Sequence, residues 1–249
     1  VADDKPDAKL SVLVLFDKIS VYKQTLFHSL AETLGGKAEL TILIHNQSLE
    51  LLEYYLDNYL DRYDYYVITP HFPLDWASQA RVARLLSRIP NRKLVMLDYL
   101  LPGYTGHFAA VYQDFENDVY DGLTQGLDLF PPTGRLKVIT LQTSLYRDSL
   151  RKGIDRFCTE HGIPVAYLTA PPERVSCGDT FLILNSQLDS GLASLARQIR
   201  AQNLVIGRDV RIISYNEFEL YEVVLGGLTT ISADFRQMGR LAAEMILDK

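Results

Sequence analysis

Short apolar runs alternate with segments of helical spacing along the whole chain. The first apolar run is Leu10–Phe16, and the residues 21–34 that follow place apolar side chains at Val21, Leu26, Leu30 and Leu34. A run of this kind predicts a buried parallel strand, and the following spacing predicts a helix that Gly35 and Gly36 end. The same order returns in strands predicted at 39–44, 65–69 and 93–97 and in helices at 48–60 and 73–87. Repeated strand and helix predict an α/β fold with a parallel, doubly wound sheet.

A loop rich in Pro and Gly at 101–108 and a short strand at 109–112 precede a second series of the same kind. This series predicts a helix from Asp114 to Leu129, strands at 136–141, 165–168, 180–184, 210–214 and 228–232, helices at 147–161 and 187–202, and a last helix after Asp234. We therefore predict two doubly wound lobes. The boundaries are a linker at 1–9, an N-terminal lobe of 10–111 plus 234–249, and a C-terminal lobe of 112–233.

One crossover of the second lobe is too short for a helix. Only eleven residues separate Leu168 from Thr180, and two of them are Pro171 and Pro172. A parallel crossover needs about a dozen residues or more, usually including a helix. We therefore expect this helix to be reduced to a loop, with the two flanking strands paired differently or partly uncovered.

Composition limits the class of protein. The 249 residues carry a net charge of -6, which argues against nucleic-acid binding by this piece alone, since phosphate contacts need a basic face. Cys158 and Cys177 are the two cysteines, a number typical of a cytosolic protein with reduced thiols. The longest apolar runs have strand length and are too short to span a membrane. The charged start, VADDKPDAK, reads as a linker or a cut from a longer protein, so the absence of a signal peptide carries little weight.

Polar and aromatic residues follow the predicted strands, where α/β proteins bind ligands. If the two lobes face each other, these side chains line one cleft. The candidates are Asp17, Lys18, Tyr22, His71, Asp98, Tyr99, Arg147, Asn185, Asn216 and Glu217. Carboxylates, amides, an Arg and aromatic rings suit a sugar, whose hydroxyls donate and accept hydrogen bonds while its C–H face stacks on a ring.

Structural roles compete with this interpretation. Tyr22 is as well explained as a half-buried helix residue, Asp98 is also a candidate cap, and Asn185 and Asn216 also suit turns. His71 has no second ligand at metal spacing. The sequence lacks GxSxG, GxxxxGK[ST] and HExxH motifs and has no GxGxxG after the first strand. Asp17 and Asp98 as a glycosidase pair are no better supported than hydroxyl binding. We expect no enzyme activity, cofactor or metal.

Four motifs, in order, resemble the sensor domain of lactose-repressor-type regulators. They are LSVLVLFDKISVYKQTLFHSL from Leu10, FLILNSQL from Phe181, DVRIISYNE from Asp209 and LTTISADFRQMGRLAAEMIL from Leu228. The wording of the last two is similar to sensors that follow a GntR-type winged helix. The resemblance implies a type I periplasmic-binding-protein-like fold, a small sugar effector and a homodimer. DNA would be bound by an N-terminal domain absent from this chain, in the bacterial cytoplasm.

The resemblance also assigns roles to residues. Tyr22 takes the place of an aromatic that stacks on the ligand, and Asn216 stands where the family usually has Asp. The ligand-binding Arg, three residues before a Gly in that family, is absent because Leu150 precedes Gly153; Arg147 or Arg151 replaces it, and we favour Arg147. Dimer-interface candidates, with a core face as the equal alternative, are Tyr54, Tyr55, Tyr59, Leu60 and apolar residues of 77–86.

Three functions remain open from the sequence. The preferred one is the effector-binding and dimerisation domain of a bacterial regulator of carbohydrate metabolism. A periplasmic sugar-binding protein of a transport system has the same fold, and the complete gene distinguishes the two. An α/β hydrolase or racemase is the weakest. A phosphorylated ligand is disfavoured because the candidate residues include few cations.

Overall fold

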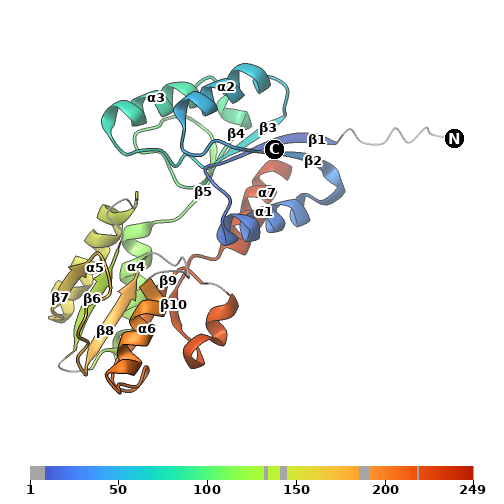
Figure 1. The fold of residues 1–249 in the computed structure, drawn as a ribbon. Helices are drawn as coiled ribbons and strands as arrows, with labels where there is room; N and C mark the ends of the chain where they lie inside the picture. The colour runs from blue at the N-terminus through green and yellow to red at the C-terminus, as the bar shows by residue number, and fades with distance from the viewer. Residues whose placement is uncertain (1–8, 132–133, 141–144, 185–190, 218, 249) are drawn as a thin grey trace. The chain divides into compact units, whose positions relative to one another are not determined.

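The computed structural model describes residues 9–131, 134–140, 145–184, 191–217 and 219–248. The chain forms two compact units, each with its own internal contacts. Unit 1 combines Val1–Gln113 with Asp234–Lys249, and unit 2 is Asp114–Ala233. Each unit holds one five-stranded sheet (Figure 1). The α/β fold class predicted from the sequence is therefore confirmed.

Unit 1 has a parallel sheet in the order β2-β1-β3-β4-β5. Its strands are β1 (Leu10–Phe16), β2 (Ala38–Ile44), β3 (Tyr65–Ile68), β4 (Leu94–Asp98) and β5 (Ala109–Tyr112), and its helices are α1 (Val21–Leu34), α2 (Leu49–Tyr59), α3 (Trp76–Leu86) and α7 (Phe235–Leu247). The helix starts follow cap chemistry: the side chains of Ser20, Ser48 and Asp75 each accept a backbone N–H of the first turn. Gly35 ends α1 with φ of 53°, a conformation that suits glycine.

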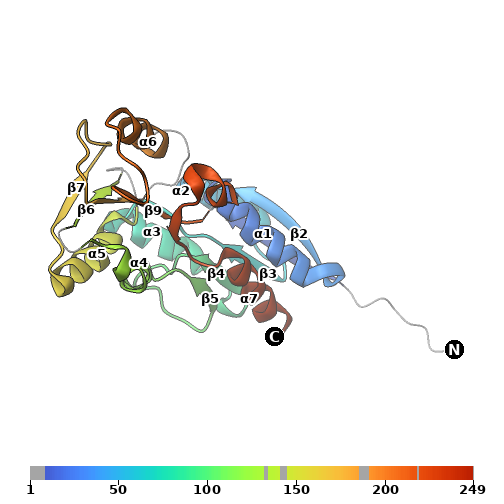
Figure 2. The same ribbon diagram turned by 90° about the horizontal axis from the view of Figure 1, so that it is seen from below.

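Helices α1 and α7 pack closely against each other, and they lie side by side in both ribbon views (Figures 1 and 2). A Cβ at Gly239 would lie only 2.3 Å from the carbonyl oxygen of Leu26, so glycine permits this approach. The Ser29 hydroxyl also donates to the carbonyl of Arg236 at 2.6 Å. Helix α7, which follows unit 2 in the chain, is thereby fixed to α1, the helix that carries the ligand candidate Tyr22.

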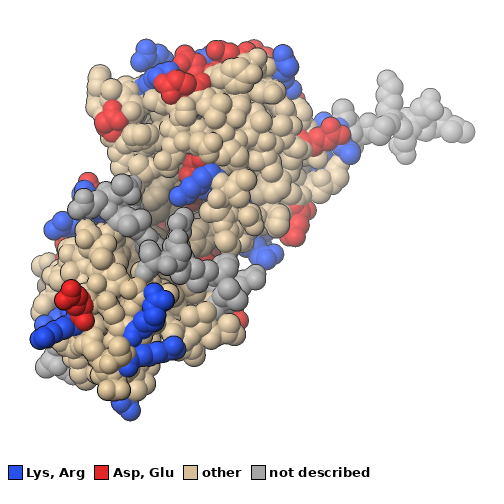
Figure 3. All heavy atoms as spheres, viewed as in Figure 1, with Lys and Arg blue, Asp and Glu red and all other residues tan. Residues whose placement is uncertain are grey.

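Helices α2 and α3 share the main hydrophobic core of unit 1 with β1, β3 and β4. Tyr55, Tyr59 and Leu60 pack against this core, and Val82, Leu85 and Leu86 belong to it. The core alternative therefore holds for these residues, whereas Tyr54 is 58% exposed. The outer faces carry opposite charges: Arg81 pairs with Glu50 and Glu53, and Arg88 pairs with Asp57. Figure 3 shows acidic and basic side chains interspersed over these two helices.

Unit 2 has a parallel sheet in the order β10-β9-β8-β6-β7. Its strands are β6 (Arg135–Ile139), β7 (Val165–Leu168), β8 (Asp179–Ile183), β9 (Arg211–Tyr215) and β10 (Thr229–Ile231), and its helices are α4 (Phe115–Gln125), α5 (Arg147–His161) and α6 (Gly191–Ala201). Short 3₁₀ turns in the two units occupy Gly35–Lys37, Asn91–Lys93, Leu127–Leu129, Glu219–Glu222 and Val224–Gly226. Gly153 of α5 lies against α4, where a Cβ would meet the Glu116 carbonyl at 2.1 Å.

The predicted loss of one crossover helix is confirmed, because residues 169–178 contain no helix. Strands β7 and β8 flank β6 on opposite sides and both remain parallel to it. From this loop, Val175 is buried in a hydrophobic cluster with Ile139 and Phe181. Towards the start of β6, Arg135 and Lys137 both pair with the fully buried Asp179, at 3.1 and 2.6 Å. Asp179, at the start of β8, is thus paired by two cations of the neighbouring strand β6.

Most predicted boundaries lie within three residues of the observed ones. The helix expected from residue 73 begins at Trp76 because Asp75 caps it. The helix expected to continue to Leu129 ends at Gln125, and a separate 3₁₀ turn follows at Leu127–Leu129. The helix expected from residue 187 is observed over Gly191–Ala201, and 185–190 lie outside the described residues. Within the ranges that the structure describes, no helix is long and apolar enough to cross a membrane.

Candidate functional site

Three predicted residues meet at the carboxyl ends of adjacent strands in unit 1. Asp17 directly follows β1, His71 follows β3 by three residues, and Asp98 is the last residue of β4. These strands are neighbours in the order β1-β3-β4. The residues are only 3%, 2% and 5% exposed, respectively. Two carboxylates and an imidazole therefore lie below the surface at the sheet edge where α/β folds bind ligands.

A lysine that the sequence analysis missed joins these residues. Lys23, in the first turn of α1, is 6% exposed, and its Nζ donates to Asp98 and lies 3.3 Å from Asp17 Oδ1. His71 Nε2 is 2.8 Å from Asp98 Oδ2 and 3.3 Å from Lys23 Nζ. We call Asp17, Lys23, His71 and Asp98 the charged cluster. Lys18, the lysine predicted for this site, is exposed.

Burial and charge act in opposite directions on the two carboxylates. Burial raises the pKa of Asp98, but the Lys23 ammonium and the hydrogen bond to His71 lower it by more than burial raises it. The pKa of Asp98 therefore lies well below the usual range. For Asp17 the same balance holds, and Lys23 again lowers the pKa most. Both carboxylates are therefore ionised at neutral pH. Lys23 is the counter-ion that makes two buried negative charges possible at this edge.

Two histidines, His45 after β2 and His71 after β3, are neutral. Burial lowers the pKa of His71, and burial lowers the pKa of His45 to about 4. The His71 ring stacks on Tyr99 with ring centres 5.5 Å apart, and the His45 ring stacks on Phe72 at 4.4 Å. His45 also bonds the carbonyl of Thr69 at 3.0 Å. These stacked rings hold the loop after β3 in one position.

Asp98 also connects the cluster to the end of unit 1. Its backbone is in the left-handed region, with φ of 72°, which is uncommon for a residue other than glycine. Gln113, the last residue before the chain enters unit 2, donates its side-chain amide to Asp98 Oδ1 at 2.5 Å. The Gln113 backbone N–H donates to the Asp98 carbonyl at 3.3 Å. Strained backbone held by several contacts is common at functional sites.

Unit 2 has a similar feature at the corresponding strand end. Strand β9 holds the place in its sheet that β4 holds in unit 1, and Asn216, directly after β9, has φ of 69°. Its N–H donates to the Ile231 carbonyl at 2.7 Å, and the N–H of Glu217 donates to Ser232 Oγ at 3.0 Å. Asn216 Oδ1 is buried and accepts no hydrogen bond from the described residues. This oxygen is therefore suited to a donor from outside the chain.

The other candidates have more ordinary surroundings. Tyr22 is half-buried and stacks on Phe235 with ring centres 5.1 Å apart. The exposed Arg147 is the first residue of α5 and pairs with Asp148 at 3.2 Å. Arg151 lies over the Tyr167 ring at 4.5 Å and pairs with Asp155, so β7 and α5 already use its guanidinium. Glu217 is exposed, and Asn185 lies outside the described residues.

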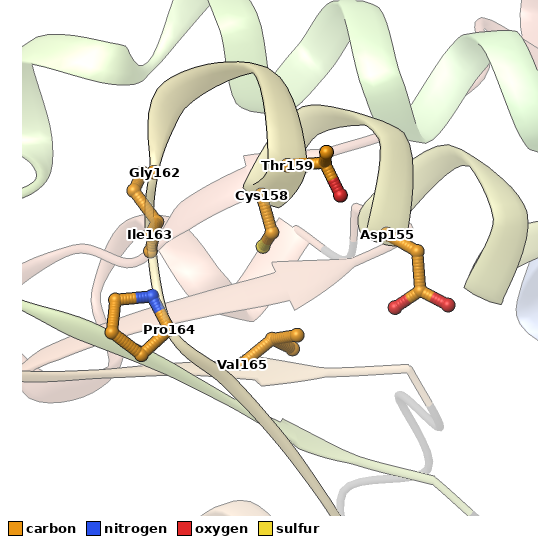
Figure 4. Close-up of a pocket in the computed structure, with 7 residues that line it drawn as sticks. All are labelled: Asp155, Cys158, Thr159, Gly162, Ile163, Pro164 and Val165. Atoms are coloured by element: carbon orange, nitrogen blue, oxygen red, sulfur yellow. The ribbon is translucent and has the colours of Figure 1, made fainter.

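A separate hollow in unit 2 lies away from these strand ends. Figure 4 shows its lining at the C-terminal half of α5 and the start of β7, with Asp155, Cys158 and Val165 among the residues. It lies at the amino end of β7, so it is not part of the predicted site.

Among the described residues, no group of three His, Cys, Asp or Glu side chains is arranged to hold a metal ion. In the charged cluster, the donors and acceptors suit hydrogen bonding to a ligand.

Comparisons with known proteins agree with this architecture. Residues 135–249 match the family model of a periplasmic binding protein-like domain. A LacI family transcriptional regulator from Silicibacter pomeroyi superposes with a TM-score of 0.72 at 18% identity, covering 96% of this chain and 92% of that chain. The dimeric Lac repressor with an 11-residue C-terminal deletion gives 0.74 at 17%, covering 96% and 90%. Transcription regulator CcpA of Lactococcus lactis gives 0.70 at 14%, covering 97% and 91%. No curated protein sequence gives a significant match. The chain therefore has the type I periplasmic-binding-protein-like fold of LacI family regulators.

Proposed function

We propose that this chain is the effector-binding and dimerisation domain of a bacterial transcriptional regulator of carbohydrate metabolism. The observation that carries the proposal is the charged cluster buried at the carboxyl edge of the unit 1 sheet, in a fold shared with solved regulators. One of those structures is a lac repressor dimer bound to operator and the anti-inducer ONPF. Ionised side chains are costly to bury, and buried groups of this kind cluster at functional sites.

A small sugar fits the chemistry of the candidate residues. Asp17 and Asp98 accept hydrogen bonds, Lys23 donates them, and a sugar hydroxyl does both. Asn216 Oδ1 supplies a further acceptor in unit 2. Tyr22 and Tyr99 offer aromatic surface near the ends of β1 and β4. In this proposal, residues at the carboxyl edges of both sheets contact the same ligand.

The regulatory response would be a shift between two arrangements of the units. A ligand that contacts residues of both units favours the arrangement in which both sets of contacts form. In a homodimer, this change alters the spacing of two DNA-binding domains that lie outside these 249 residues. We propose a GntR-type winged helix for that domain and a cytoplasmic location for the whole protein. No catalytic role is assigned to any residue.

A periplasmic sugar-binding protein is the second candidate. The match of 135–249 to a periplasmic binding protein-like domain supports it equally well. The two candidates share the ligand class and differ in what precedes the domain in the complete gene. A DNA-binding domain there supports the regulator, and a signal peptide supports the transport protein.

Thermal unfolding against a panel of neutral monosaccharides, sugar phosphates and nucleosides tests the ligand assignment. A ligand at about 100 times its Kd stabilises a protein by about 2.7 kcal/mol. For a domain of this size that raises Tm by roughly 5 to 11 °C. We expect one neutral sugar to produce such a shift and Asn216→Ala and Tyr22→Ala to abolish it. Asn58→Ala, on the exposed face of α2, is a matched control that keeps it. A shift that survives both site variants would contradict the proposed site.

A further inference from the structure

Lys23 contributes the one lysine or arginine charge in the buried cluster of unit 1. Its Nζ donates to Asp98, lies 3.3 Å from Asp17 Oδ1 and is 5.9 Å from the centre of the Phe16 ring. Asp98 raises the pKa of Asp17 by charge repulsion, and His71 Nε2 lies 2.8 Å from Asp98 Oδ2. With a neutral His71, two negative charges and one positive charge remain at this edge.

Two physical effects oppose a lysine in this place. Burial removes the ammonium from water, and a cation in the first turn of a helix is unfavourable to the helix dipole. Lys23 is nevertheless 6% exposed and lies three residues after the Ser20 cap. The two carboxylates compensate for both effects. The position of the ammonium is therefore set by Asp17 and Asp98, at the same edge where the ligand is proposed to bind.

We propose that Lys23 is a specificity-determining residue. Its ammonium occupies the position beside Asp17 and Asp98 that a cationic group of a ligand would otherwise take. This inference rests on the proposed sensor function and narrows its ligand to a neutral polyhydroxylated molecule. An amino group on the ligand would compete with Lys23 for the same two carboxylates. A phosphate would add negative charge beside a cluster that already has an excess of one. A hydroxyl accepts from the ammonium and donates to a carboxylate, so it fits without a change in charge.

The cation place can be tested without knowing the sugar. Lys23→Ala removes the ammonium and leaves room for a small alkylammonium ion between Asp17 and Asp98. We expect n-propylammonium chloride to raise the Tm of Lys23→Ala by about 2 °C or more above the effect of equimolar sodium chloride. Lys37→Ala, which removes an exposed lysine of the same unit, should show no such difference. Equal responses of the two variants to n-propylammonium would overturn the proposal.

A second measurement uses the unaltered chain, so it does not depend on the folding of a variant. Tm is measured with neutral monosaccharides and with their amino-deoxy and phosphate forms, such as D-glucose, D-glucosamine and D-glucose 6-phosphate. We expect only neutral sugars to stabilise the protein. Stabilisation by an amino or phosphate form equal to that of its neutral parent would overturn the specificity role. No stabilisation by any compound would refute the sensor function, whereas the propylammonium result would still decide whether Lys23 fills a cation place.

Discussion

Replacing Asp98 by Asn tests whether the charged cluster is held together as the distances indicate. The side chains have nearly the same shape, and Asn tolerates the left-handed backbone of this position, where φ is 72°. The substitution therefore removes a charge with little change in packing or backbone strain. Lys23 would keep only Asp17, 3.3 Å away, as a charged partner. Breaking a buried ion pair costs about 3 to 5 kcal/mol, and the remaining partner favours the lower value, about 3 kcal/mol.

The matched control is Asp57→Asn, which breaks an exposed pair with Arg88 at 2.7 Å. Exposed pairs contribute about 0 to 1 kcal/mol. Thermal unfolding followed by far-ultraviolet circular dichroism should show a Tm lower by about 6 to 12 °C for Asp98→Asn, at 2 to 4 °C per kcal/mol. The control should lose less than about 4 °C. Equal losses in the two variants would refute the reasoning that burial makes the Asp98 charge essential.

Three further predictions concern groups around this site and in unit 2. The pKa of His45 is about 4 in the folded chain and 6.5 in the unfolded one. As pH falls from 6.5 to 4, only the unfolded chain gains a proton at this residue, so the free energy of unfolding should drop by about 3 kcal/mol. His45→Gln should remove that part of the pH dependence of Tm. Gly239→Ala should destabilise by about 1 to 3 kcal/mol because its Cβ meets the Leu26 carbonyl, whereas Gly36→Ala, with open space around it, should be nearly neutral in the same thermal assay. Burial raises the pKa of the Cys158 thiol to about 12, whereas Cys177 is exposed. Iodoacetamide at pH 8 should therefore label one thiol in the native chain and two after unfolding. Two labels before unfolding would contradict the packing of α5.

The order of strands and helices is strongly determined by local sequence. Continuous apolar strands such as Leu10–Phe16 and cap residues such as Ser48 and Asp234 predict the elements correctly because burial and capping act over a few residues. The lost crossover helix was predictable for the same reason, since chain length between Leu168 and Thr180 limits what can form. Helix ends were less certain, as α4 shows by ending at Gln125 and continuing only as a 3₁₀ turn.

The candidate site was predictable where it follows strand ends. Asp17, His71 and Asp98 were expected to lie near one another because their strands are parallel, and the structure brings them together. Lys23 was missed because its Cα lies in a helix and its long side chain reaches back to the sheet edge. One signal was present in the sequence: a lysine without a nearby acidic residue in the first turn of a helix opposes the helix dipole. Such a residue needs a carboxylate partner from elsewhere in the fold.

Gln113 was missed for a different reason. It follows β5 by one residue and carries no charge, so nothing in the local pattern separates it from a loop residue. Its bond to Asp98 depends on the parallel pairing of β5 with β4, which places Tyr112 opposite Asp98. The predicted Arg147 and Arg151 illustrate the limit of counting along a helix. Arg151 is already engaged by Tyr167 and Asp155, which sequence spacing does not reveal.

The central claim, that the chain is a sensor for a neutral sugar, has a direct optical test. Trp76 is the single tryptophan and is 85% exposed. It is the first residue of α3, which follows β3 and the loop that carries His71. The measurement is the fluorescence emission of Trp76 during titration with each neutral monosaccharide of the panel. We predict a saturable change with one sugar that is absent in Asp98→Asn. A chain whose emission and Tm respond to none of these sugars would contradict the sensor function, and a response that survives Asp98→Asn would contradict the role of the charged cluster in it.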